Sequence, residues 1–190
     1  LTQLSQLLND SEVKNAEQNV QIKTLGKRLN AALATKVHEL SNYRSEFFGR
    51  LREILGKTAG VHIVGDRFVL QSELLFDQGS AELGMAGQSQ VHEIGLTLMQ
   101  LAERIPTDID WILRVDGHTD NVPIKNERFA SNWELSAARA ISVVKYLIGQ
   151  GLPATRLAAT GFGKYQPIDN GNSAAAMRRN RRIELKLTQR

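Results

Sequence analysis

The chain has 190 residues, enough for one domain of ordinary size plus an extension, or for two small domains. Hydrophobic residues make up 42% and charged residues 23%, which is typical of a soluble globular protein and excludes an intrinsically disordered chain. The absence of cysteine excludes disulfides, thiolate metal sites and cysteine nucleophiles, and the net charge of +4 suits an anionic partner without selecting one.

Residues 1–57 form the first predicted region, because they contain no proline and only two glycines. We predict one long helix, or two in line, with a seam too narrow for a globular core. The seam is buried either in a parallel coiled coil with a second copy or against the following domain. Its clearest part has heptad-like spacing: Leu33, Val37, Leu40, Phe47, Leu51 and Ile54.

Glycines at 56, 60 and 65 mark the start of a second region, predicted to be one domain over residues 58–190. Its pattern predicts two helices, at 91–101 ending near Pro106 and from Asn132 to Gly149 or Gly151. Strands are predicted at 61–64, 67–75, 111–115, 157–160 and 183–187, with loops at 116–131 and 161–176. This order indicates an α/β sandwich, with both helices on one face of a mixed sheet.

The loop after the third strand is the most polar in the chain and holds Asp116, His118 and Asp120. It admits three readings: a turn that bonds its own backbone, a binding loop, or a catalytic or metal cluster. A catalytic or metal cluster is the least favoured of these. His118 is the only histidine in the sequence near this loop, whereas a zinc site needs more nitrogen or sulfur ligands, and no common nucleophile or phosphate-loop motif is present.

The helix that follows carries a second polar group, with Asn132 expected as its N-cap. Asn132, Ser136 and Arg139 share one helix face, because they are four and three residues apart. Opposite this face we expect an apolar stripe: Ala137, Ile141, Val144 and Ile148. The polar face is either solvated or functional. If Asp120 comes near Arg139, the pair could hold a zwitterion, the arginine taking its carboxylate and the aspartate its ammonium.

A basic run, RRNRR, occupies residues 178–182. It fits solvated arginines, contact with a cell-wall polymer or other anion, or nucleic-acid binding. No aromatic stacking platform is interleaved with it, so we do not expect nucleic acid as the partner.

Five segments, in order, resemble the OmpA-like, or OmpA/MotB, peptidoglycan-binding domain over about residues 75–187. They are FD with GSAEL at 76–83, GHTDN at 117–121, NWELSAARA at 132–140, GFG at 161–163 between Arg156 and Pro167, and NRRIE at 180–184. The resemblance implies that family's α/β sandwich fold. It also implies non-covalent binding of the peptidoglycan peptide stem, chiefly its diaminopimelate residue.

In that family the Asp of the GHTD stretch and the Arg of the LSxxRA stretch grip the ligand, which here implies Asp120 and Arg139. Supporting contacts are implied for Asp77, Thr119, Asn132 and one arginine of the NRR stretch, for which we favour Arg182 over Arg181.

Within the family, the segments look closest to the MotB branch, the stator subunits of ion-driven motors. This implies a homodimer, a membrane proton-channel partner of the MotA/ExbB type, and a periplasmic domain of an inner-membrane protein with a membrane helix upstream. A general envelope tether of the OmpA/Pal type is the alternative. We expect no enzymatic activity, cofactor or metal; a wall-acting amidase or transpeptidase is the less favoured enzyme alternative.

Overall fold

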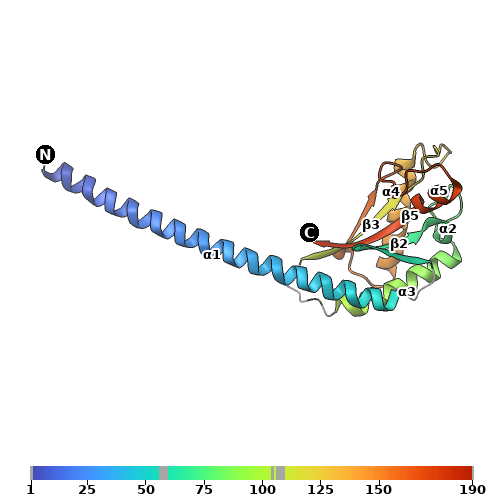
Figure 1. The fold of residues 1–190 in the computed structure, drawn as a ribbon, viewed down its shortest axis with the longest axis horizontal. Helices are drawn as coiled ribbons and strands as arrows, with labels where there is room; N and C mark the ends of the chain where they lie inside the picture. The colour runs from blue at the N-terminus through green and yellow to red at the C-terminus, as the bar shows by residue number, and fades with distance from the viewer. Residues whose placement is uncertain (1, 56–59, 104, 106–109, 190) are drawn as a thin grey trace. The chain divides into compact units, whose positions relative to one another are not determined.

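The computed structural model describes residues 2–55, 60–103, 105 and 110–189. Figure 1 shows the course of the chain. The helices and strands are α1 (Thr2–Leu55), β1 (Val61–Val64), β2 (Arg67–Gln71), α2 (Ser72–Leu75), α3 (Met85–Ala102), β3 (Trp111–His118), α4 (Asn132–Gly149), the 3-10 helix η1 (Ala154–Arg156), β4 (Leu157–Gly161), α5 (Ala174–Asn180) and β5 (Arg182–Gln189). None of the described helices has the length and apolar character needed to cross a bilayer.

The chain divides into two compact units, Leu1–Arg44 and Ser45–Arg190. The boundary expected after residue 57 falls at 56–59, which lie outside the described residues. The last turns of α1 belong to the second unit, where the buried Phe48 ring stacks on Phe68 of β2 with 4.9 Å between ring centroids. The C-terminal end of α1 therefore packs on the following domain. The contact is made by Phe48, which is not one of the predicted seam residues.

The first unit is a helix whose described apolar residues face solvent in the single chain. Their exposed fractions run from 53% to 67%, far above those of core residues. They are Val20, Ile22, Leu25, Leu29, Leu33 and Val37. A helical stripe left exposed in this way is available to a partner.

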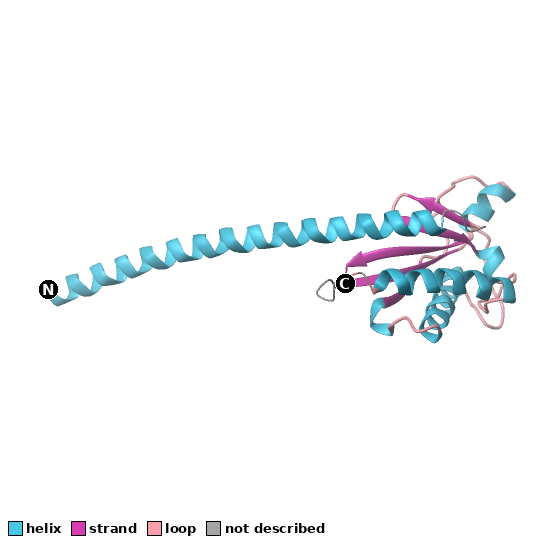
Figure 2. Ribbon diagram, turned by 90° about the horizontal axis from the view of Figure 1, so that it is seen from below, coloured by secondary structure: helices cyan, strands magenta, loops and turns pink. Residues whose placement is uncertain are grey.

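The second unit is built on a five-stranded mixed sheet of order β1-β2-β5-β3-β4. β3 and β4 are parallel and joined through α4, whereas the other neighbouring strands are antiparallel. Figure 2 shows the strands as a layer flanked by helices. The predicted α/β sandwich on a mixed sheet, preceded by a long helix, is confirmed.

Three predicted elements differ from the structure. The second strand ends at Gln71 and continues as α2, and α5 lies where a loop and the start of the basic run were expected. β3 runs on through His118, so the first polar residues of the expected loop are strand residues. α3 ends at Ala102, and the expected end near Pro106 lies outside the described residues.

The two faces of the sheet differ in chemistry, because successive residues of a strand point to opposite sides. One face is apolar and includes Phe68, Leu113, Val115, Ile183 and Leu185, all nearly inaccessible to solvent. The other face carries the charged residues of β3 and β5 in register, with Asp116 opposite Glu184 and His118 opposite Arg182.

Two glycines let α4 pack closely on the apolar face. A Cβ at Gly117 of β3 would lie 2.1 Å from the Ser136 carbonyl oxygen, and one at Gly161 of β4 would lie 2.6 Å from the Ala137 nitrogen. No side chain fits in either gap. The N-terminal half of α4 is therefore held against the ends of β3 and β4, beside the loop that follows β3.

Candidate functional site

A pocket of about 650 Å³ opens where the loop after β3 meets the start of α4. Its walls come from α2 and the loop behind it, the loop at 119–124, the first turns of α4, and α5 with the residue after it. It brings together five of the six predicted site residues: Asp77, Thr119, Asp120, Asn132 and Arg139.

Arg139 lies in the wall of this pocket and is only 5% exposed. Its guanidinium donates to the carbonyl oxygens of Ser80 (2.8 Å) and Asp77 (3.2 Å) and lies 5.1 Å from the centre of the Phe76 ring. Among the described residues, no carboxylate forms an ion pair with it. Burial and the charge of Arg181 lower the pKa of Arg139 to about 10, although the charge of Asp120 acts in the opposite direction, so Arg139 remains cationic at neutral pH.

Asp120 supplies a negative charge to the lining of the same pocket. Its Oδ1 accepts the backbone N–H of Val122 at 3.0 Å, and its Oδ2 accepts Arg181 Nη1 at 2.6 Å. The first of these bonds is the self-bonding turn that the polar loop predicted. The same carboxylate also lines the pocket, so the turn and the binding loop are one structure.

Asn132 and Thr119 hold the loop in place. The Asn132 amide donates to the carbonyl oxygens of Val122 (2.9 Å) and Asp120 (3.2 Å) and accepts the N–H of Ile124 (3.1 Å). Thr119 Oγ1 donates to the Asp120 carbonyl oxygen at 2.9 Å. Asn132 is the first helical residue, and Ser131, not Asn132, is at the N-cap position.

The arginine of the NRR stretch that reaches the pocket is Arg181, not the favoured Arg182. Arg181 bridges Asp120 and Glu73, and Glu73 also pairs with Arg178 at 3.4 Å. These hydrogen bonds raise the pKa of Arg181 against the opposing effect of burial. Sequence reasoning missed Glu73, because it lies on the unpredicted helix α2.

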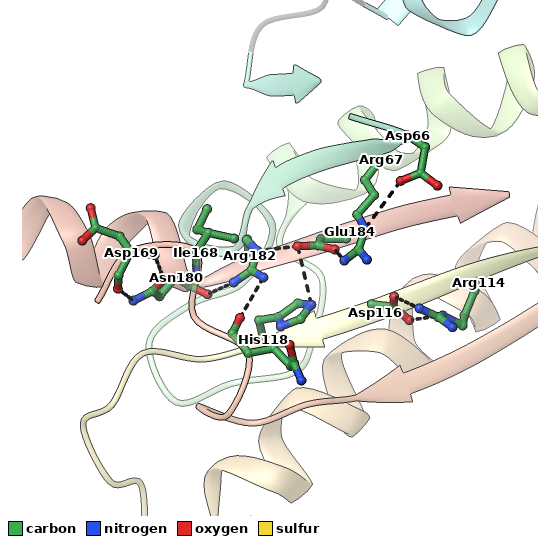
Figure 3. A network of polar contacts seen from close by, with 11 residues as sticks. Asp66, Arg67, Arg114, Asp116, His118, Ile168, Asp169, Asn180, Arg182 and Glu184 are labelled. Carbon is green, nitrogen blue, oxygen red and sulfur yellow. Dashed lines mark hydrogen bonds and ion pairs between the residues drawn. The ribbon is translucent and has the colours of Figure 1, made fainter. Parts of the chain in front are cut away.

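Arg182 points instead into a closed network on the charged face of the sheet (Figure 3). Its Nε donates to Glu184 Oε1 at 2.6 Å, and its other nitrogens donate to the carbonyl oxygens of Asn180 and Gln166. Glu184 also bonds Arg67, and His118 Nε2 lies 3.7 Å from its Oε1. Arg182 is therefore not among the residues that line the pocket, because it is the first residue of β5 and Glu184 holds its guanidinium in this network.

The polar cluster suspected in the sequence is divided between these two places. Asp116 is fully buried and held by two 2.7 Å bonds from Arg114, and His118 stacks on Phe162, whereas Asp120 lies in the pocket. No group of metal-ligating side chains was found within the described ranges. The pocket therefore offers separated positive and negative charges, an arrangement for binding a zwitterion.

The polar face of α4 is buried, contrary to the solvated alternative. Ser136 is inaccessible and its hydroxyl donates to the Trp133 carbonyl oxygen and accepts the N–H of Gly163, both at 2.9 Å. The expected apolar stripe is wrong, because Ile141 and Ile148 are about two-fifths exposed. The buried apolar residues of α4 lie instead on the same side as Arg139: Leu135, Ala140, Val143 and Leu147.

The chain is similar in sequence and in structure to several known proteins, among them MotB proteins and a cell wall anchor. The YtxE protein of Bacillus subtilis is 38% identical over 118 residues, which are 62% of this chain and 46% of that protein. A MotB-like protein from Desulfovibrio vulgaris has a TM-score of 0.70 at 27% identity, covering 80% of this chain and 95% of that one. The cell wall anchor of the type VI secretion system from Pseudomonas aeruginosa has a TM-score of 0.61 at 29% identity, covering 75% and 96%.

The chain spans about half the length of the curated relatives that it matches. Residues 75–181, more than half of the chain, match the OmpA family, and this stretch contains the whole pocket except the α2 residues Ser72 and Glu73. The fold, the pocket and this match agree, and the chain belongs to the OmpA family.

Proposed function

We propose that this chain binds peptidoglycan non-covalently, by holding the diaminopimelate residue of a peptide stem between Asp120 and Arg139. The observation that carries the proposal is a buried arginine, Arg139, for which the described residues provide no carboxylate ion-pair partner, in the wall of an open pocket that Asp120 also lines. A buried charge is normally paired, because its removal from water is unfavourable. A ligand carboxylate would provide the missing partner.

The free end of a diaminopimelate side chain fits this arrangement, because it carries an ammonium and a carboxylate on one carbon. Arg139 has donors left after its two carbonyl bonds and can bind the carboxylate. The ammonium would bind Asp120, where Arg181 now donates. Arg181 can yield this position and keep an ionic partner, because Glu73 holds its other nitrogen.

The proposed role is an anchor for a membrane complex in the periplasm, with a stator subunit of the MotB type as the favoured form. The likeness to a MotB-like protein and to a secretion-system cell wall anchor supports an anchor. A channel partner of the MotA/ExbB type and attachment to the inner membrane belong to the stator form. A general envelope tether of the OmpA/Pal type uses the same pocket without a channel.

We also propose that α1 pairs with a second copy, since its stripe of apolar residues is exposed in the single chain. A 54-residue helix reaches about 80 Å at 1.5 Å per residue, so a paired stalk would also act as a spacer. Exchanging Leu25 and Leu29 for Glu should convert a dimer to a monomer in analytical ultracentrifugation. An unchanged sedimentation coefficient would exclude pairing through this stripe.

Co-sedimentation with purified sacculi tests the binding function. The wild-type chain should pellet, whereas Arg139→Ala and Asp120→Ala should remain soluble, because each leaves one ligand charge unpaired. Arg128→Ala is the matched control, since the Arg128 side chain is exposed, forms an ion pair with exposed Glu82 and does not line the pocket. Equal pelleting of all four proteins would exclude the pocket as the site.

A further inference from the structure

An exposed aromatic pair adjoins the pocket and has no role in the binding proposed above. Trp133, in the first turn of α4, stacks on Tyr165, in the turn after β4, with ring centroids 5.3 Å apart and planes at 27°. The rings are 49% and 59% exposed. The chain's other tryptophan, Trp111, is buried.

The backbone beneath the pair is fixed. The buried Ser136 hydroxyl links the Trp133 carbonyl oxygen to the N–H of Gly163. Gly163 has a φ of +54°, which a side chain rarely allows, and it begins the turn that leads to Tyr165. The two rings are therefore presented as a preformed surface, which lowers the entropy lost on binding.

The same backbone joins the pair to the pocket. Trp133 follows directly on Asn132, which lines the pocket and holds its loop. The Gly163 carbonyl oxygen accepts the N–H of Thr119, the residue before Asp120, at 2.9 Å. The pair therefore stands on backbone that also shapes the pocket, and we expect a polymer whose peptide enters the pocket to pass along this rim.

We infer that the Trp133–Tyr165 pair is a sugar-binding surface that packs against a pyranose ring of the glycan to which the peptide stem is attached. The inference rests on the proposed function, because the covalent link between stem and glycan is what brings a sugar to this rim. Exposed aromatic rings suit a sugar, whose ring C–H groups form an apolar face while its hydroxyls stay in water. Lys164 lies 5.8 Å from the Tyr165 ring centroid, and its ammonium can donate hydrogen bonds to those hydroxyls.

Titration calorimetry with two ligands tests this inference: a stem tripeptide ending in diaminopimelate, and the same tripeptide carrying its N-acetylglucosamine–N-acetylmuramic acid disaccharide. The wild-type chain should bind the disaccharide form roughly three- to tenfold more tightly. Trp133→Ala should remove this preference and leave the affinity for the bare tripeptide unchanged. Tyr165→Ala should reduce the preference, and Tyr165→Phe should retain it.

Ile141→Ala is the matched control, since Ile141 is an exposed apolar residue farther along the same helix. Equal affinity of the wild-type chain for both ligands would overturn the inference while leaving the pocket intact, and would assign the pair to a protein partner. A loss of tripeptide affinity in Trp133→Ala would make Trp133 part of the pocket wall instead. Failure of the wild type to bind the tripeptide would refute the proposed function itself, and the sugar surface with it.

Discussion

Two arginines, Arg139 and Arg182, are almost equally buried in this domain and have opposite surroundings. Arg182 bonds Glu184 at 2.6 Å, and Glu184 also bonds Arg67, with His118 Nε2 3.7 Å from the same carboxylate. Within the described part of the chain, Arg139 bonds two carbonyl oxygens and lines an open pocket. Burial alone therefore does not identify a binding residue. What distinguishes Arg139 is a buried positive charge that forms no ion pair with the described residues.

The network around Arg182 and the pocket around Arg139 therefore have different expected roles. The network on the charged face of the sheet contributes to folding, because each of its charges has a partner within the chain. For the pocket we propose a role in binding, with a ligand as the partner of Arg139. Substitutions in the first region should change stability, and substitutions in the second should change affinity.

The largest effect on stability is expected from Glu184→Ala. Removing this carboxylate leaves Arg182 buried without an ionic partner and deprives Arg67 of its bond, which should lower the free energy of unfolding by about 3–5 kcal/mol. Urea denaturation followed by circular dichroism measures the change. A loss below about 1 kcal/mol would show that the network is not needed for the fold.

Acidification should lower the stability of the domain through His118, which lies beside this network. Burial and the charge of Arg182 lower the pKa of His118 to about 4, although Glu184 acts in the opposite direction. The unfolded chain takes up this proton near pH 6.5, so between pH 6.5 and 4 the unfolded state binds more protons. As the pH is lowered from 6.5 to 4, the free energy of unfolding should therefore decrease, by about 3 kcal/mol in total.

His118→Gln provides the control for this pH dependence. In the upper half of the window, above the range in which carboxylates titrate, its unfolding free energy should change little with pH. A slope identical to that of the wild type would assign the dependence to other groups.

A smaller effect is expected from Glu73→Gln, which removes the second partner of Arg181. Arg181 would then depend on Asp120 alone, and a ligand ammonium would displace it less easily. Affinity for a diaminopimelate peptide should fall about two- to fivefold. An increase in affinity would indicate that Glu73 competes for the ligand instead of receiving Arg181.

The smallest change in stability is expected from Arg139→Met. This substitution removes a buried charge that has no ionic partner and keeps a long apolar side chain, so the free energy of unfolding should change by less than about 1 kcal/mol. A loss as large as that for Glu184→Ala would mean that Arg139 supports the fold, and would remove the distinction between the two arginines.

The sequence predicts the large elements well and the small ones poorly. Helical spacing and strand alternation are sustained over α1, α3, α4 and most of the strands, so their periods are readable. Helices α2 and α5 have four and seven residues, too few for a period to appear. They carry Glu73 at the pocket and lead into Arg181, so the sequence gives no sign of Glu73 and does not favour Arg181 over Arg182.

The orientation of α4 was misjudged for a different reason. Apolar spacing favoured a stripe through Ile141 and Ile148, but the buried side also contains Asn132, Ser136 and Arg139. A rule that places polar residues outside fails where they are satisfied by carbonyl oxygens and backbone N–H groups. The family motif, by contrast, led to Asp120 and Arg139, which the structure brings to one pocket.

We propose that Arg139 binds a carboxylate of the ligand, and a comparison of two ligands tests this directly. Titration calorimetry would compare two stem tripeptides that end in diaminopimelate or in lysine, which lacks only the distal carboxylate. The wild-type chain should prefer the diaminopimelate peptide by at least about thirtyfold, and Arg139→Met should bind both peptides equally weakly. Equal binding of the two peptides by the wild type, or a preference that survives in Arg139→Met, would contradict the account.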